Sequence, residues 1–524
     1  MPRPARGHRS RRGLRGGTRE HPPRLRAGLS GPARLPRAGA QPRLRPPPRR
    51  STIDATRVDR GGGGRGTRWH PGRRGGHAPG HRLLPRARRG HAVSVVVRQS
   101  PRLEEAVHER TLDDGLRVHV IPKPGYQSSF AILLADYGSI DNVFWVPGEE
   151  APREVPAGIA HFLEHKLFED EAGDVFDQFA RLGASANAYT YYGETAYHFS
   201  TSDAFERCLE LLLEFVTTPY FTDEQIEKER KVIAQEIRLY EDAPDLKAHL
   251  NLLRCLYHRH PIREDITGSL ESIARIDREL LQLCHRTFYR PDNLLLVACG
   301  DLDPARVFDL AARGAEARAA RANLAVPLRR ALPSEPLGVA SPRACERMSV
   351  SSPRVLLGFK DRPAPFGPPR LRAARELGFA LELVFGRSSA FFERHCASGL
   401  IDDTFSASYS TGRGDYAHAV LGGETPDPEG LVAACLEELV AARAHGLDAN
   451  DFRRLRNSSY GRFLRGFNSV EQVACGEADA TLQGWDLLAY PELLEAISLD
   501  DVEARLRALD LEAHAVSLVR PLED

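Results

Sequence analysis

The sequence lacks any apolar run that approaches the roughly 18 continuous residues of a membrane-spanning helix. It also lacks the apolar core of a secretory signal after its basic N-terminal region. These absences exclude a membrane-spanning chain and an exported one. We therefore expect a soluble protein in the cytoplasm.

Cysteine pairs of the CxxC type are also absent, and the eight cysteines stand singly, mostly inside apolar helix or strand patterns. This distribution excludes a disulfide framework and a cysteine-type zinc site. It fits buried free thiols in a reducing compartment. Any metal site must then use histidine and carboxylate ligands. The cysteines are Cys208, Cys255, Cys284, Cys299, Cys345, Cys396, Cys435 and Cys475.

Residues 1–100 contain no lysine, only three acidic residues, and few aromatic or β-branched residues. They hold 26 of the 72 basic residues, all arginine, for a net charge of +23, whereas the remainder carries −22. Such a segment buries too little apolar surface to offset its ordering entropy, so 1–100 is predicted to be a disordered leader.

Three explanations of this leader stay open. An Arg-rich, acid-poor leader resembles an organellar transit peptide. Its Arg/Gly tracts could instead bind nucleic-acid phosphates. The same bias arises when GC-rich DNA upstream of the true start is translated, in which case the mature protein lacks the leader.

From about residue 105 the pattern becomes that of an α+β protein. Strands are predicted at 115–124 and 128–141, two helices over 157–182, and a strand pair over 186–202 that turns at YYGE. Three helices follow over 204–257, a fourth over 268–288, and a strand over 293–303.

After a proline-rich linker at 321–343 the element order recurs. Strands are predicted at 354–359, 403–410, 416–423 and 514–519, with helices over 370–398 and 429–510. The sequence thus predicts two homologous α/β domains, 104–320 and 344–524. The second contains no HxxEH, so one active site per chain is expected.

The segment GIAHFLEHKLFED, residues 158–170, places His161 and His165 on one face of a helix with Glu164 beside them. Two such imidazoles can hold one metal ion, and the carboxylate can reach a water on it. The alternative is a polar stripe on an amphipathic helix. It is disfavoured because apolar residues surround the helix axis. They are Ile159, Phe162, Leu163, Leu167 and Phe168.

A third ligand is expected on the helix predicted over 221–245, which Thr222 and Gln225 begin as a capping box. Glu229 and Glu236 fall within its apolar stripe. Two carboxylates that face a core need a cation. That cation could be an Arg or Lys from elsewhere, but the upstream HxxEH favours a shared metal ion. The stripe consists of Ile226, Ile233, Ile237 and Tyr240.

These residues resemble the inverzincin pattern of the pitrilysin/insulysin peptidase family, which includes the mitochondrial processing peptidases. The likeness extends over about 105–524, and the chain is most similar to bacterial members built as one unit. It is carried by YGSID, VPAGIAHFLEHKLFE, ASANAYT, EKERKVIAQEI, FYRPDNLLLVACGDLDP and GLIDDTFSASY.

The resemblance implies a zinc metalloendopeptidase with one Zn²⁺ per chain, acting on peptides or small unfolded polypeptides. It further implies two units around a peptide chamber, hence a homodimer or a heterodimer with a related chain. No membrane or nucleic-acid partner is expected. The implied residues are His161, His165 and Glu236 as ligands, Glu164 as base, Glu229 beside a ligand, and Asn187 and Ala188 as contacts to substrate by strand addition.

One departure concerns an Arg and a Tyr that steady the substrate carbonyl in two-half relatives, where this sequence has Glu393 and Leu400. This departure implies that a partner chain supplies substrate contacts or that catalysis is weaker. The alternative function is a non-catalytic subunit of a peptidase pair, since such partners exist in that family, and a nucleic-acid-associated protein is a third. Two other motifs are set aside: the His258 and His260 pair as a metal site, and RGD at 413–415 as accidental.

Overall fold

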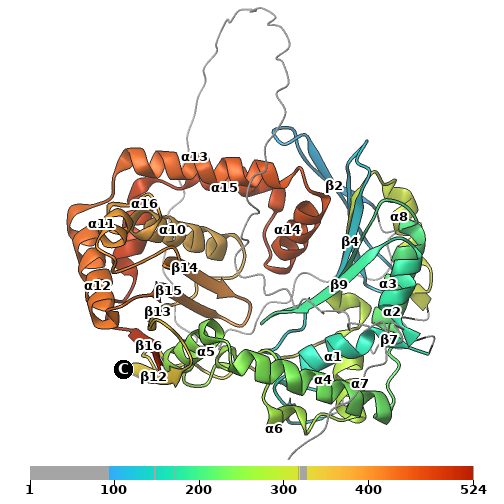
Figure 1. The fold of residues 1–524 in the computed structure, drawn as a ribbon. Coiled ribbons are helices and arrows are strands. Elements are labelled where there is room, and N and C mark those ends of the chain that lie inside the picture. Colours follow the sequence, from blue (N-terminus) through green and yellow to red (C-terminus); the bar gives the residue numbers. More distant parts are fainter. Residues whose placement is uncertain (1–93, 147–148, 172, 317, 319–326, 523–524) are drawn as a thin grey trace, which may run out of the picture. The chain divides into compact units, whose positions relative to one another are not determined.

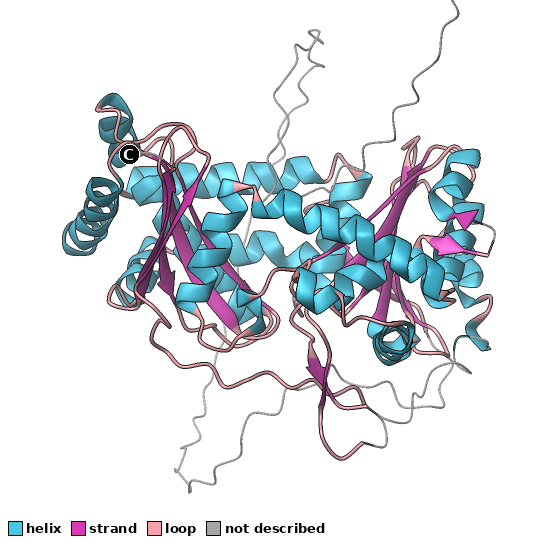
Figure 2. Cartoon of the chain, turned by 60° about the horizontal axis from the view of Figure 1, so that its bottom comes forward, coloured by secondary structure: helices cyan, strands magenta, loops and turns pink. Residues whose placement is uncertain are grey.

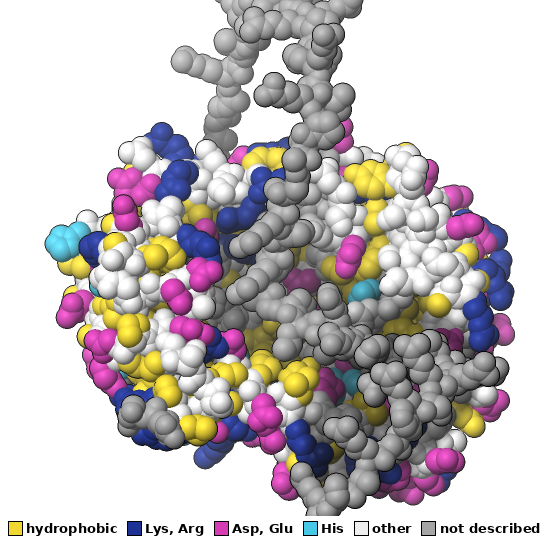
Figure 3. All heavy atoms as spheres, in the orientation of Figure 1, with side chains coloured by type: hydrophobic (Ala, Val, Ile, Leu, Met, Phe, Trp, Pro, Cys, Tyr) yellow, Lys and Arg dark blue, Asp and Glu magenta, His cyan; other side chains and the backbone are white. Residues whose placement is uncertain are grey.

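The computed structural model describes residues 94–146, 149–171, 173–316, 318 and 327–522. Within them the chain forms two main sheets, each flanked by helices (Figures 1 and 2). The predicted α+β class with two sheet-plus-helices domains is confirmed. Acidic, basic and apolar side chains are interspersed over the described part of the face drawn in Figure 3.

Seven strands form the first sheet, in this order across it: β1 (Val96–Ser100), β2 (Glu105–Thr111), β3 (Arg117–Pro122), β11 (Leu294–Gly300), β4 (Ser129–Ala135), β10 (Thr195–Thr201) and β9 (Ser185–Thr190). Only β3 and β11 pair in parallel within it. Every residue of β11 is buried, as its unbroken apolar sequence LLLVACG predicts for a central strand. β9 is an edge strand, so one side of its backbone lacks a strand partner among the described residues.

The helices between residues 159 and 312, in the first half of the chain, pack against this sheet or against one another. α1 lies against β9 and β10 on one side and against α4 on the other. Two short hairpins accompany them, β5 (Val143–Phe144) with β6 (Arg153–Glu154) and β7 (Glu169–Asp170) with β8 (Gly173–Asp174). The helices are α1 (Ile159–Leu167), α2 (Val175–Arg181), α3 (Phe205–Thr217), α4 (Asp223–Glu241), α5 (Pro244–Leu256), α6 (Leu270–Ile273), α7 (Arg278–Phe288) and α8 (Pro304–Ala312).

The single helix predicted over 268–288 is wrong, since two helices, α6 and α7, occupy that range. Asp277 separates them because its carboxylate accepts a hydrogen bond from the backbone N–H of Leu280 and begins α7 there.

The second sheet has five strands in the order β12 (Arg343–Met348), β16 (His514–Pro521), β13 (Arg354–Lys360), β15 (Tyr416–Glu424) and β14 (Ser406–Gly412). β12 and β16 are parallel and the other pairs antiparallel. Its half of the chain also contains α10 (Pro368–Phe385), α11 (Ala390–Ala397), α12 (Pro428–His445), α13 (Ala449–Gly466), α14 (Val470–Leu482), α15 (Tyr490–Ala496) and α16 (Leu499–Ala508).

Each half lends one helix to the sheet of the other. α5 packs against β12, β13 and β16, while α14 packs against β4 and β11. Leu252 of α5 lies directly over Gly358 of β13, where an added Cβ would meet its side chain at 2.9 Å. Val473 of α14 joins Ile132 and Val297 in one buried cluster. The two halves therefore share hydrophobic cores.

The predicted disordered leader, 1–100, is wrong in its last residues, because Val96–Ser100 form β1 and pair with β2. The valine-rich stretch VSVVV favours a strand, but averaging over 100 residues concealed it. Residues 1–93 lie outside the described residues, as do 321–326 of the predicted linker. The rest of that linker is anchored, since Arg330 pairs with Asp136 and Glu335 with Lys360.

All eight cysteines are free thiols, but three of the eight are not buried as predicted, and one of these, Cys475, is partly buried. Cys345 lies on the edge strand β12 and Cys396 on the outward side of α11, and both are exposed. In the described part of the chain, no helix is both long and apolar enough to cross a membrane.

Removing the contact between α5 and the second sheet tests the shared core. Leu252→Ala is expected to lower the free energy of unfolding by about 2–5 kcal/mol, because the side chain is fully buried. Urea denaturation measures this loss. Leu239→Ala, at a leucine on α4 that is 68% exposed, is the control and is expected to change stability by less than about 0.5 kcal/mol. Equal effects would contradict the shared core.

Candidate metal centre

α1 is a helix with almost no exposed surface. Every residue from Ile159 to Leu167 is buried except His165, which is partly buried. The helix begins at Gly158. This residue must be glycine because its φ is 89° and because a Cβ there would lie 2.5 Å from the Thr267 carbonyl oxygen. The polar residues of HxxEH are thus held inside the protein, as the apolar residues around them predict.

α4 supplies the other carboxylates, and it lies beside α1 (Figure 1). Thr222 begins it by accepting a hydrogen bond from the backbone N–H of Gln225, as predicted. The reciprocal half of the predicted capping box is replaced by a bond from the Thr222 hydroxyl to the Gln225 side chain. Ile226, Ile233 and Ile237 are buried, so the predicted stripe, with both glutamates in it, faces the core.

Three candidate ligands converge between these helices. The Nε2 atoms of His161 and His165 lie 3.7 Å and 3.8 Å from Oε2 of Glu236, and the three atoms fall within 4.8 Å of one another. These separations are too long for hydrogen bonds. They approach the spacing of about 3.4 Å expected between tetrahedral ligands of one zinc ion. The donor set therefore fits a small divalent cation.

Hydrogen bonds orient two of these ligands. Nδ1 of His165 lies 2.8 Å from Oε1 of Glu229, which turns its Nε2 toward the centre. The Tyr240 hydroxyl donates to Oε1 of Glu236 at 2.7 Å and leaves Oε2 to face the imidazoles. Buried Nδ1 of His161 has no hydrogen-bond partner among the described residues.

The electrostatics differ between the two histidines. Burial, with the charge of His165 second, lowers the pKa of His161 well below its usual value and keeps it neutral, the form in which imidazole binds a metal. Burial alone would also lower the pKa of His165. The hydrogen bond to Glu229 and the nearby carboxylates outweigh that effect and raise it.

Glu164 lies on the same helix and points toward the first sheet. Burial raises its pKa, which the charge of His165 and a hydrogen bond from Thr190 oppose. Oγ1 of Thr190, the last residue of β9, donates to Oε2 of Glu164 at 2.6 Å. The sequence alone does not predict this role of Thr190, because the two residues are 26 positions apart and no local pattern links them.

The predicted substrate residues lie on β9. Asn187 and Ala188 pair with His198 and Tyr197 of β10 across one side of the strand. On β9, the Asn187 Oδ1 atom accepts a hydrogen bond from the backbone N–H of Ala188 at 2.9 Å. An added strand that takes this N–H must first displace the Asn187 side chain.

A second group of potential ligands, which sequence analysis did not find, consists of Glu109, His119 and Glu477. Arg98 pairs with both carboxylates, and Nδ1 of His119 lies 2.8 Å from Glu477. An arginine therefore already supplies the cation at this second group. His260, set aside as a ligand, uses both ring nitrogens on the backbone of Gly414 and Ile262.

Residues 150–269 match the insulinase family, peptidase family M16, and residues 275–459 match the M16 inactive domain. The chain is 37% identical over 404 residues to YmfH of Bacillus subtilis, named an uncharacterized zinc protease, covering 77% of this chain and 93% of that one.

Solved structures extend the likeness. An M16-like peptidase from Alicyclobacillus acidocaldarius matches with a TM-score of 0.75 and 33% identity, over 81% of this chain and 100% of that one. Pitrilysin matches with a TM-score of 0.63 at 17% identity, over 82% of this chain but 47% of its own, which supports the fold alone.

Loss of the Glu229 carboxylate tests the centre directly. Glu229→Ala frees the His165 ring to rotate and is expected to weaken Zn²⁺ binding by about 10- to 100-fold. Competition with a chelating dye measures the affinity. Glu227→Ala is the control, since Glu227 is on the same helix, 61% exposed, and pairs with Arg230. Equal affinity in both variants would contradict the assigned orientation.

Proposed function

The chain belongs to the insulinase family of peptidases, M16, and on that premise we propose that it is a zinc-dependent metalloendopeptidase of peptides or small unfolded polypeptides. The observation that carries the proposal is the convergence of three ligand atoms that are not hydrogen-bonded to one another, from the buried His161 and the partly buried His165 and Glu236. Such an arrangement is costly unless a cation lies among them.

His161, His165 and Glu236 would hold one Zn²⁺, with Glu229 fixing the ring of His165. A bound zinc ion supplies Lewis acidity to the scissile carbonyl and acidifies an attacking water. Glu164 takes the proton from that water and passes it to the amine that leaves. Its raised pKa, caused by burial, strengthens the carboxylate as the base that takes this proton.

The substrate would bind as an added strand along the open edge of β9, next to the base. Main-chain groups of Asn187 and Ala188 would pair with an extended peptide, once the Asn187 side chain has moved from the Ala188 N–H. Strand addition demands an extended partner, which favours peptides and unfolded segments over folded proteins.

A dimer, either of two such chains or with a related chain, is part of the proposal. It follows the family resemblance, which implies two units around a peptide chamber. A cytoplasmic location is proposed as well, supported by eight free thiols and bacterial relatives. Nucleic-acid binding was linked to residues 1–100, most of which lie outside the described residues.

The second candidate is a non-catalytic subunit of a peptidase pair. It is favoured by Glu393 and Leu400, which stand where the carbonyl clamp of two-half relatives was expected. Against it stands the full set of ligands and base, since a silent subunit has no chemical need for Glu164 beside two imidazoles.

Glu164→Gln separates the two candidates. The variant keeps the shape of the side chain but cannot take a proton, so hydrolysis of an unstructured peptide is expected to fall by at least about 100-fold. Zinc content, measured by atomic emission, is expected to stay at one per chain. Glu227→Gln serves as the control and should retain full hydrolysis. Undetectable hydrolysis by the zinc-loaded wild type, alone or mixed with a related chain, would favour the silent subunit.

A further inference from the structure

The RGD sequence, residues 413–415, forms the turn between β14 and β15, and each of its residues contacts other parts of the chain. Arg413 reaches into the first half. The Gly414 carbonyl accepts a hydrogen bond from His260 at 2.7 Å, and the Asp415 carboxylate pairs with Arg370. With φ at +92°, Gly414 also leaves no room for a Cβ, which would meet Ile140 at 2.5 Å. Arg413 and Gly414 therefore dock the turn onto the first half, while Asp415 ties it to α10 of the second half.

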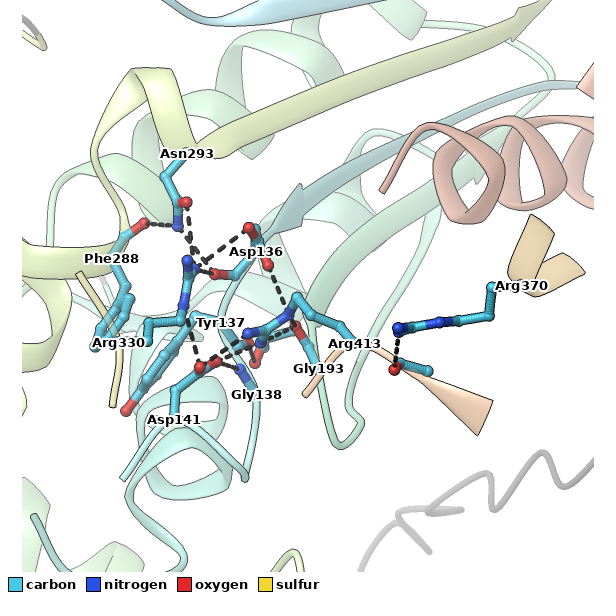
Figure 4. Close-up of polar contacts among 12 residues, drawn as sticks. Asp136, Tyr137, Gly138, Asp141, Gly193, Phe288, Asn293, Arg330, Arg370 and Arg413 are labelled. Atoms are coloured by element: carbon cyan, nitrogen blue, oxygen red, sulfur yellow. Dashed lines mark hydrogen bonds and ion pairs between the residues drawn. The ribbon is translucent and has the colours of Figure 1, made fainter. Parts of the chain in front are cut away.

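Arg413 is the centre of this contact (Figure 4). Its guanidinium donates hydrogen bonds to both carboxylate oxygens of Asp141, and the bond to Oδ1 is 2.9 Å long. The same guanidinium lies 2.8 Å from Oδ1 of Asp136. Nη2 also donates to the carbonyl oxygen of Gly193 at 2.6 Å. One side chain from the second half thus binds two carboxylates and one backbone carbonyl of the first.

The charges in this cluster balance. Arg330, from the segment between the halves, lies 3.1 Å from Asp141 and 3.3 Å from Asp136, so two guanidinium groups meet two carboxylates (Figure 4). Burial alone would raise the pKa of Asp136, but the arginines outweigh it and lower that pKa. A partly buried network of mutually paired charges favours one geometry.

Gly193 belongs to the four-residue turn between β9 and β10, and that turn is held from two sides. The backbone N–H groups of Ser139 and Ile140 donate to the carbonyls of Tyr191 and Tyr192, each at 3.0 Å. Arg413 holds the Gly193 carbonyl from the other side.

Two glycines allow these close approaches. A Cβ on Gly138 would lie 2.4 Å from the Tyr192 carbonyl, and one on Gly193 would lie 3.3 Å from Nε of Arg413. The backbone of the turn is therefore packed directly against its two supports.

The same hairpin contains Thr190, which precedes the turn and bonds Glu164. We propose that Arg413 is a positioning residue. It reaches from the second half and fixes the β9–β10 turn, and the fixed turn holds the edge of β9 and the hydrogen bond from Thr190 to Glu164 in place. The proposal rests on the proposed function insofar as β9 binds peptide. Its geometric part is independent of that function.

The position of Arg413 sets it apart from another arginine–aspartate pair. Arg505 and Asp361 form a partly buried pair bonded to Tyr409, but that pair lies within the second half and, among the described residues, has no hydrogen bond or ion pair with residues 191–194. It therefore offers a control of matched chemistry and burial.

The test compares two double variants of the full chain. Arg413→Met with Asp141→Asn removes the arginine and one carboxylate, so no excess buried charge remains beside Arg330 and Asp136. Arg505→Met with Asp361→Asn makes the same change at the control pair. Hydrogen exchange over residues 185–201, followed by mass spectrometry without added zinc, is expected to quicken about tenfold in the first variant. The control should match the wild type there.

Peptide kinetics provide the second measurement. The Arg413 variant is expected to raise KM about tenfold, with zinc content unchanged, because the strand that receives the peptide is no longer held. Three results would each overturn the proposal. They are exchange over 185–201 at the wild-type rate in the Arg413 variant, exchange that quickens equally in the control variant, and an unchanged KM. Absence of hydrolysis in the wild type would instead count against the proposed function, and the exchange data would still decide the positioning.

Discussion

The structure depends on one electrostatic constraint: a glutamate and two imidazoles face one another inside the protein without hydrogen bonds between them. Glu236 cannot be neutralised by His161, whose pKa is lowered by burial, and it lies 3.8 Å from Nε2 of His165. Among the described residues, no arginine or lysine ion pair with Glu236 is found. A divalent cation at this point satisfies the three groups together, so the crossing of α1 and α4 is suited to metal binding.

Much of the surrounding fold serves to hold that crossing. Gly158 sets the start of α1, Thr222 begins α4, and β9 brings Thr190 to the base. The second half contributes without any ligand of its own: α14 covers the back of the first sheet, and Arg413 reaches the β9–β10 turn. A half without ligands of its own can thus matter to the site through packing and through one partly buried arginine.

The sequence predicted the local features well. Helical spacing brought His161 and His165 together, the apolar stripe of α4 identified Glu236 and Glu229, and alternation located β9 and β10. What it could not predict are contacts between distant segments. Hydrophobic periodicity predicts that α5 and α14 each have an apolar face, but it does not predict which sheet that face covers. Arg413 and Asp141 are 272 positions apart, and only the folded chain brings them into contact.

X-ray diffraction at the zinc absorption edge tests the central claim most directly. Crystals grown with Zn²⁺ are expected to show one strong anomalous peak per chain, within bonding distance of Nε2 of both histidines and of Oε2 of Glu236. A peak at Glu109 and Glu477 with none between α1 and α4, or a Glu236 carboxylate turned away from the ion, would contradict the account.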